Sequence, residues 1–166
     1  MMKLTALKVD PEFQGKIPPL TFEELEQLEK NIVNDGKVIN PIIVWNGLIV
    51  DGHNRYAILQ KHPDISYTVH EKEFADRFEV IIWICKNQLG RRNLSPEQKN
   101  YLLGKQYEAE KVAHGGDRKS ADAKSSYHND NLISGEKTCD RIAKENGVNR
   151  ITVIRAEKFA NCVDEA

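Results

Sequence analysis

Apolar residues at helical spacing mark the first regular element, a helix that begins after Thr21. The threonine hydroxyl can accept a hydrogen bond from a free N–H of the first turn, and the Glu24 carboxylate can accept one from the backbone N–H of Thr21, as in a capping box. The apolar positions recur every three or four residues: Leu25, Leu28 and Ile32. Gly36 suits the left-handed conformation that follows a helix, so we predict the end of the helix at Asp35.

A hairpin is predicted next, because two runs rich in β-branched residues flank Asn46-Gly47. This pair accepts positive φ at both turn positions, as a tight turn between antiparallel strands requires. The predicted strands cover residues 41–45 and 48–50. The second strand runs into Asp51-Gly52-His53-Asn54-Arg55, after which residues 57–59 continue as a short helix.

One more strand and two more helices are predicted before the C-terminal part. Residues 67–69 have strand character, and residues 74–88 predict a helix with a buried apolar stretch. Ser95-Pro96 marks a helix start, because serine caps, proline needs no N–H partner in the first turn, and Gln98 can complete a capping box. We expect that helix to reach about Val112. Residues 114–137 are rich in Gly, Ser, Asp, Asn and Lys and predict a flexible linker or a long loop.

Two short helices joined by a tight turn are predicted in residues 139–160. Ala143 is small where the second helix would pack, and Gly147 permits the unusual backbone angle of the turn. Val148 would fill the corner, and Asn149 would cap the second helix. Two inward positions follow at helical spacing: Val153 and Ala156. This pattern is typical of the helix-turn-helix that binds DNA.

In that arrangement residues 149–159 form the recognition helix. The side chains expected to face outward are Asn149, Arg150, Thr152, Arg155 and Lys158. Arginine can bind guanine through two hydrogen bonds, and asparagine can bind adenine in the same way. Lys158, and Lys144 on the first helix, are better placed to contact phosphates. The alternative is a helical hairpin with a solvated charged face, in which Glu145 and Glu157 dilute the positive charge.

The composition limits the class of protein without identifying it. The chain has 166 residues, of which 40% are hydrophobic, so one or two small domains are expected. No segment approaches the roughly 18 apolar residues of a membrane span, and the N-terminus lacks a signal segment, so we expect a cytoplasmic protein without a membrane partner. The net charge of −1 does not point to nucleic acid, but phosphate contacts are local. The cysteines lack the spacing of a metal site: Cys85, Cys139 and Cys162.

The turn over residues 51–55 has features of a phosphate site. A helix start offers free N–H groups and the positive end of the helix dipole. Gly52 lets an anion approach the backbone, and Arg55 could add a bidentate contact. The alternative is a tight turn in which Asp51 caps the helix and Arg55 forms a salt bridge.

The order of these features resembles the ParB/sulfiredoxin-like fold. Residues 20–25 resemble the first helix of that family, and residues 41–44 with 49–56 resemble its central strand pair and phosphate motif. ParB proteins carry Gly-Glu-Arg-Arg in this motif and sulfiredoxins carry Gly-Cys-His-Arg. Gly52 and Arg55 match both families.

A second segment carries the same resemblance. Residues 87–96 resemble the ParB sequence Glu-Asn-Leu-Gln-Arg-Glu-Asp-Leu-Asn-Pro, with matches at Arg91, Leu94 and Pro96. A helix-turn-helix follows, as in ParB. The resemblance therefore covers nearly the whole chain, and the chain also resembles the shorter ParB-like proteins of plasmids, phages and other mobile elements.

In ParB-type partition proteins this fold binds CTP, whose phosphates and magnesium switch a DNA clamp. The resemblance implies a phosphate site lined by Gly52, His53, Asn54 and Arg55, a second nucleotide motif with Gln88 and Arg91, and CTP or ATP with Mg²⁺ as the cofactor. His53 and Asn54 replace the ParB glutamate and first arginine. His53 also stands where sulfiredoxins have a nucleophilic cysteine, which argues against sulfinic-acid reduction.

The predicted fold is α+β, with a ParB/sulfiredoxin-like domain over residues 1–92, formed by a small mixed sheet with helices, and an all-α helix-turn-helix region over residues 93–166. The expected function is sequence-specific binding of double-stranded DNA by a homodimer that acts in partition or transcription on the nucleoid or a plasmid. Three alternatives stay open: a nucleotide switch or triphosphate hydrolase, a nuclease-like variant, and a protein-interaction module. Binding is favoured over catalysis, although His53 could serve as a general base.

Overall fold

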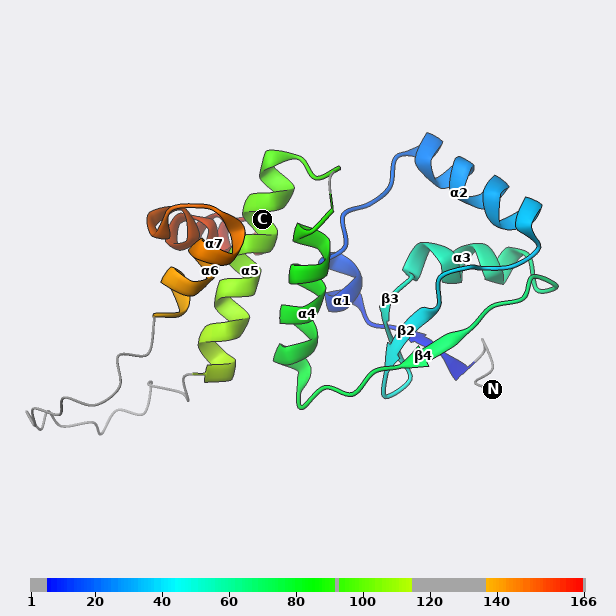
Figure 1. Cartoon of the computed structure of the whole chain (residues 1–166), viewed down its shortest axis with the longest axis horizontal. Coiled ribbons are helices and arrows are strands. Elements are labelled where there is room, and N and C mark those ends of the chain that lie inside the picture. Colours follow the sequence, from blue (N-terminus) through cyan, green and yellow to red (C-terminus); the bar gives the residue numbers. More distant parts are fainter. Residues whose placement is uncertain (1–5, 92, 115–136, 166) are drawn as a thin grey trace, which may run out of the picture. The chain divides into compact units, whose positions relative to one another are not determined.

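A computed structural model of the protein describes residues 6–91, 93–114 and 137–165 and confirms an α+β fold (Figure 1). The strands form one mixed sheet: β1 (Lys8–Val9), β2 (Ile42–Trp45), β3 (Leu48–Asp51) and β4 (Val69–Glu71). Seven helices are present in the described ranges: α1 (Pro11–Gly15), α2 (Phe22–Asp35), α3 (His53–Lys61), α4 (Arg77–Leu89), α5 (Pro96–His114), α6 (Thr138–Asn146) and α7 (Arg150–Asp164).

The chain divides into two compact units, Met1–Ile84 and Cys85–Ala166. The first unit holds the whole sheet with α1, α2 and α3, whereas the second holds α5, α6 and α7. The dividing point lies inside α4, and the domain boundary expected after residue 92 stays a prediction. None of the helices in the described part of the chain is long and apolar enough to cross a lipid bilayer.

The sheet is built around the predicted hairpin. Strands β2 and β3 pair antiparallel, with Trp45 opposite Leu48 and Val44 opposite Ile49. The turn between them uses positive φ at both Asn46 and Gly47, as the Asn-Gly signal requires. Parallel partners flank the hairpin, β1 beside β3 and β4 beside β2, which gives the order β1-β3-β2-β4.

The register of the hairpin is irregular near the end of β3. Val44 pairs with Ile49, but the next residue of β2, Ile43, pairs with Asp51, so β3 uses one more residue than β2 over this stretch. Bulges of this kind bend a strand and re-aim the side chains that follow. Ile49 and Val50 are both fully buried, although neighbouring residues of a regular strand face opposite sides of the sheet.

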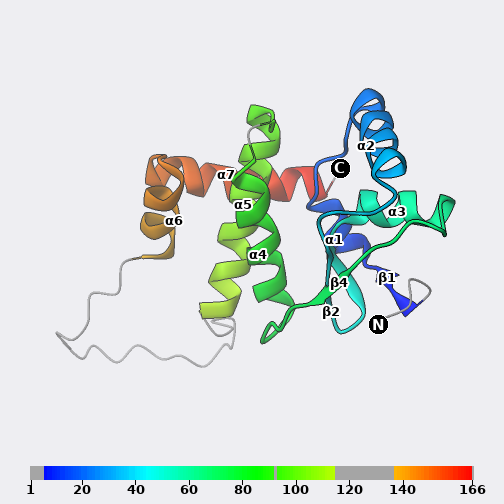
Figure 2. The ribbon, with the colours of Figure 1, turned by 45° about the vertical axis from the view of Figure 1, so that its right-hand side comes forward.

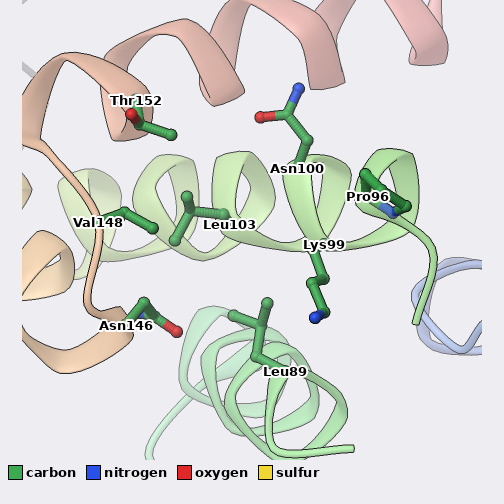
Figure 3. A pocket seen from close by; sticks show the side chains of 8 residues that line it. All are labelled: Leu89, Pro96, Lys99, Asn100, Leu103, Asn146, Val148 and Thr152. Atoms are coloured by element: carbon green, nitrogen blue, oxygen red, sulfur yellow. The ribbon is translucent and has the colours of Figure 1, made fainter. Parts of the chain in front are cut away.

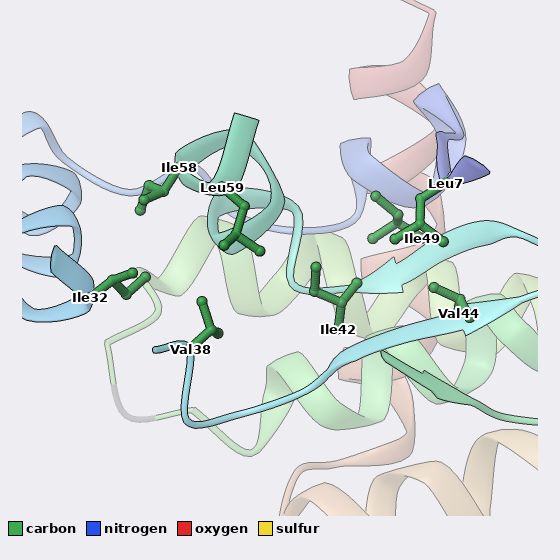
Figure 4. Close-up of a cluster of buried hydrophobic side chains, with 8 residues drawn as sticks. All are labelled: Leu7, Ile32, Val38, Ile42, Val44, Ile49, Ile58 and Leu59. Carbon is green, nitrogen blue, oxygen red and sulfur yellow. The ribbon is translucent and has the colours of Figure 1, made fainter. Parts of the chain in front are cut away.

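The core of the first unit lies under α2 and α3. Figure 4 shows its side chains, which come from the segment before β1, from α2, from the segment between α2 and β2, from the hairpin and from α3: Leu7, Ile32, Val38, Ile42, Val44, Ile49, Ile58 and Leu59. The predicted capping box begins α2, since Glu24 N–H donates to the Thr21 hydroxyl over 3.2 Å and Thr21 N–H donates to the Glu24 carboxylate over 2.9 Å. The predicted start and end of this helix are confirmed.

Several element boundaries differ from the predictions. Helix α3 begins at His53, directly after Gly52, rather than near residue 57, and α4 begins at Arg77 rather than at residue 74. The third predicted strand is displaced toward the C-terminus, because β4 shares only Val69 with residues 67–69. Strand β1 and helix α1 were not predicted, since strand β1 has only two residues and helix α1 only five. The predicted loop or linker of residues 114–137 lies almost entirely outside the described residues.

In the second unit α5 and α7 cross closely, as Figures 1 and 2 show from two directions. The predicted start of α5 is confirmed, with Gln98 N–H bonded to the Ser95 hydroxyl and Ser95 N–H bonded to the Gln98 side chain. Gly104 on α5 faces the backbone of α7 at the crossing. A Cβ there would lie 2.6 Å from the carbonyl carbon of Ala156 and 2.9 Å from the Ala160 methyl. Small residues on both helices therefore set the distance between them.

We predict that Gly104→Ala lowers the free energy of unfolding by about 1–3 kcal/mol, because the added methyl overpacks the crossing. The destabilisation caused by overpacking exceeds the stabilisation of about 1 kcal/mol that replacing glycine with alanine brings inside an unstrained helix. Urea denaturation followed by circular dichroism at the helix band measures it.

Gly90→Ala is the matched control, because a Cβ at Gly90 would meet only ordinary contacts at 3.6 Å or more. Equal stability of the two variants would contradict the close crossing.

Candidate nucleic-acid interface and phosphate turn

Helices α6 and α7 are joined by the tight turn predicted at Gly147. Gly147 ends α6 in the left-handed conformation, with φ of 65°, and Val148 N–H bonds to the carbonyl of Ala143 over 2.9 Å. The side chain of Asn149 accepts a 2.8 Å hydrogen bond from Ile151 N–H and caps α7. The predicted cap is confirmed, and α7 extends to Asp164, beyond the predicted end at residue 159.

The inward faces of the pair form a small core with α5. Its members are Leu103, Cys139, Ile142, Ala143, Val153 and Ala156. The predictions for Ala143, Val153 and Ala156 are confirmed. Val148 differs from its prediction, because it is 37% exposed and does not fill the corner. It lines an open pocket of about 290 Å³ together with Leu103 and Thr152, as Figure 3 shows.

All six side chains predicted to contact DNA are exposed: Lys144, Asn149, Arg150, Thr152, Arg155 and Lys158. Arg155 and Lys158 are three residues apart and share the face of α7 that points away from its buried residues. Arg150 lies at the first turn, 3.6 Å from the Asp140 carboxylate. Thr152 lies on the flank of α7, where it borders the pocket in Figure 3.

The acidic groups of the helix pair are neutralised within the second unit. Glu157 pairs with Lys111 of α5 over 2.6 Å, and its carboxylate raises the pKa of that lysine. Glu145 pairs with Arg141 over 2.9 Å and with Lys86 over 3.2 Å. Burial alone would raise the pKa of Glu145, but hydrogen bonds from these two cations lower it.

The outward cations lack such partners. None of the carboxylates in residues 6–91, 93–114 and 137–165 forms an ion pair with Lys144, Arg155 or Lys158. Glu145 and Glu157 therefore do not cancel the charge of the outward face. The helical-hairpin alternative assumed that these two glutamates dilute the positive charge of the pair. The outward face of the pair carries net positive charge.

A buried carboxylate holds α6 against α5. Glu110 is 1% exposed, accepts a 2.9 Å hydrogen bond from Gln106 and forms an ion pair with Arg141 of α6. Removing one partner of a buried pair leaves an uncompensated charge, which is strongly destabilising. Sequence reasoning missed this contact, because a glutamate inside a helix looks the same whether it faces water or a neighbouring helix.

The turn between β3 and α3 brings together four of the six predicted nucleotide-site residues. Gly52 has φ of 101° and precedes the first turn of α3, which has no side-chain cap. A Cβ on Gly52 would lie 3.0 Å from the guanidinium of Arg55, so glycine leaves room for that side chain. Arg55 donates to the Asp51 carboxylate over 2.8 Å and to the Pro41 carbonyl over 3.2 Å. The salt-bridge alternative for Arg55 is therefore present in this structure.

His53 is enclosed at the start of α3. It is 6% exposed, and neither of its ring nitrogens has a hydrogen-bond partner in the structure. Burial lowers the pKa of His53, the nearby Asp51 carboxylate acts in the opposite direction, and Arg55 lowers it further. The imidazole is therefore neutral at pH 7. The Nε of Arg55 is also buried without a partner, while Asn54 is half-buried.

Gln88 and Arg91 belong to the second unit rather than to the unit that holds residues 52–55. Gln88 is buried near the end of α4 and its side-chain oxygen has no partner, whereas Arg91 is exposed. In the described part of the chain no three His, Cys, Asp or Glu side chains gather closely enough to hold a metal ion.

No family model and no curated protein matches the chain. A search of solved structures finds the C2221 form of a Pnob8-like ParB-N domain, with a TM-score of 0.55 and 23% sequence identity. The match covers 64% of this chain and 43% of the ParB-N chain, so this protein spans less than half of that structure. At this identity the likeness concerns the fold, and the chain has a ParB-like fold.

Proposed function

We propose that the protein binds double-stranded DNA in a sequence-specific manner, with α6 and α7 as a helix-turn-helix and α7 as the recognition helix. The observation that carries the proposal is the sorting of charge on this pair. Its glutamates are paired with cations inside the second unit, while Lys144, Arg155 and Lys158 face outward without a carboxylate partner among the described residues. An unneutralised cationic helix face fits a polyanion.

The roles of these residues follow from their places on the pair. Asn149, Arg150 and Thr152 lie at the first turn of α7, the part of a recognition helix that reaches base edges in the major groove. Arg155, one turn further, can bind guanine through two hydrogen bonds. Lys144 and Lys158 would contact phosphates, which fixes register but carries no sequence information.

With this binding activity we propose a biological role in partition or transcription regulation, in the cytoplasm on a nucleoid or plasmid of a mobile element, and the ParB-like fold of the chain is compatible with that role. A homodimer would present two recognition helices and bind a palindromic site. Selection from a random duplex pool, with and without CTP and Mg²⁺, tests specificity and symmetry together. A pool that stays random under both conditions contradicts the proposal.

We predict that Arg155→Ala weakens binding to the selected site by about 1–3 kcal/mol, because a bidentate base contact is lost. Lys158→Ala should instead weaken binding to all sequences similarly and reduce the slope of log affinity against log salt by about one. Titrations by fluorescence anisotropy at several salt concentrations separate the two effects.

Lys30→Ala is the control, because Lys30 is an exposed lysine of α2 in the other unit. Arg155→Ala with unchanged affinity would show that α7 does not read the bases.

A second function, nucleotide binding at the β3–α3 turn, is favoured by one observation. His53 and the Nε of Arg55 are buried polar groups without partners beside the uncapped start of α3. A phosphate group would fit the turn formed by Gly52, His53, Asn54 and Arg55. Its oxygens would accept hydrogen bonds from His53, from the Nε of Arg55 and from the free N–H groups of the first turn of α3. Bound Mg²⁺ would supply neutralisation of the phosphate charge. Asp51 opposes this binding, because its carboxylate already occupies one nitrogen of Arg55.

We predict that CTP or ATP with Mg²⁺ gives a binding isotherm in calorimetry with the full chain, and that Arg55→Ala abolishes it while duplex binding persists. Asp51→Asn should bind the nucleotide at least as well as the unchanged protein, because it removes the competing carboxylate. Absence of heat from a folded wild-type protein with either nucleotide would eliminate this second function.

The burial of His53 also predicts a pH dependence of stability. Its pKa is lower in the folded chain than the ordinary value of 6.5, so the unfolded chain binds the proton more readily. The free energy of unfolding should therefore fall as the pH drops below about 6.5. His53→Leu should weaken this dependence, since leucine fills the site and does not titrate.

Urea denaturation at pH 7.5 and 5.5, followed by tryptophan fluorescence, measures the effect, because Trp45 and Trp83 both lie in the first unit. An identical pH dependence in the wild type and in His53→Leu would show that the pKa of His53 does not differ between the folded and the unfolded chain, which contradicts the prediction.

A further inference from the structure

Ile151, at the second position of α7, is 56% exposed, which is the largest exposure of any large apolar side chain in the described part of the second unit. Its backbone is fixed, because its N–H donates to the Asn149 side chain over 2.8 Å. Sequence reasoning passed over this residue, since it selected only polar side chains for the outward face. A single exposed apolar residue is ordinary, and what distinguishes Ile151 is its position on α7.

Ile151 stands in line with the outward cations. It precedes Arg155 by four residues and Lys158 by seven, a spacing that places all three on one face of a helix. Because helical side chains lean toward the N-terminus, Ile151 occupies the leading end of that face. The face therefore begins with a branched apolar side chain and continues with two cations.

Charge makes a protein partner a poor fit to this position. Arg150 and Arg155 flank Ile151 on the exposed part of α7, and the next exposed large apolar residue of the same helix, Val163, lies three turns away. A second copy of this face would bring like charges together, and the apolar area of one isoleucine is too small to offset that repulsion. A ligand that is anionic overall and carries one local apolar group fits better.

The major groove of DNA offers that combination. Among the base edges exposed there, the C5-methyl of thymine is the apolar group, and the surrounding backbone is anionic. We propose that Ile151 contacts the methyl group of a thymine in the DNA site and so specifies thymine at one position of each half-site. This inference rests on the proposed DNA-binding function and adds the base that one residue reads.

The test uses the duplex selected from the random pool, in which each thymine is replaced singly by uracil. Uracil pairs as thymine does and lacks only the methyl group. At one position per half-site the replacement should weaken binding of the unchanged protein about three- to tenfold, the effect of losing one apolar methyl contact.

The same replacement should leave the affinity of Ile151→Ala unchanged, and this variant should bind the thymine duplex about as weakly as the wild type binds the uracil duplex. Alanine is the better helix former and Ile151 is exposed, so the variant should fold, which circular dichroism verifies. Val163→Ala removes a 47% exposed valine from the far end of α7 and should keep the full sensitivity to uracil.

Two failures are distinguishable. If a site is selected and every uracil replacement weakens binding of the wild type and of Ile151→Ala equally, the thymine contact is overturned. The DNA-binding proposal is unaffected by that result. A pool that yields no selected site overturns the DNA-binding proposal and the inference with it.

Discussion

The close crossing of α5 and α7 at Gly104 is the constraint on which the second unit depends. There is no room for a Cβ at Gly104 beside Ala156 and Ala160, so the two helices pack this closely only with these small residues facing each other. A helix held in this way has a fixed rotation about its own axis. That rotation decides which residues of α7 face the core and which face solvent, and the whole candidate DNA interface follows from it.

Ion pairs and a hydrogen bond between α5 and α7 further stabilise the packing of these two helices. Lys105 of α5 and the hydroxyl of Tyr101 each bind the Asp164 carboxylate at the end of α7 over 2.8 Å, and burial together with that carboxylate raises the pKa of Tyr101. Lys111 binds Glu157 further along the same two helices. These contacts anchor α7 through its acidic residues and leave its cations free of them. One set of interactions therefore serves both the packing and the charge pattern.

Local signals in the sequence predicted local structure well. Thr21 with Glu24, Asn46 with Gly47, Ser95 with Gln98, and Gly147 before Asn149 each satisfy backbone groups within a few residues, so their effects do not depend on distant parts of the chain. Contacts between distant segments could not be predicted in this way. The register shift before Asp51 and the partners of Glu110 and Glu157 depend on which elements meet.

In the candidate sites too, features that depend on local sequence were predictable, whereas features that depend on three-dimensional contacts were not. The exposure of Arg155 and Lys158 follows from helical spacing, and it was predicted. The exposure of Ile151 is equally periodic, yet a search restricted to polar residues overlooked it. At the β3–α3 turn the sequence allowed two roles for Arg55, a phosphate contact or a salt bridge, because both use the same guanidinium. Only the geometry showed that Asp51 reaches it.

In the proposed nucleotide site, the Asp51–Arg55 pair would make the turn selective for the valence of an anion. With the carboxylate in place, the guanidinium is already neutralised, and a monovalent ion such as chloride gains little by displacing it. A polyphosphate carries several negative charges on one rigid group, and it can also use the free N–H groups of α3 that a side-chain carboxylate does not reach. In that site the internal salt bridge would exclude abundant small anions, because only a dense cluster of negative charge gains enough to displace the Asp51 carboxylate.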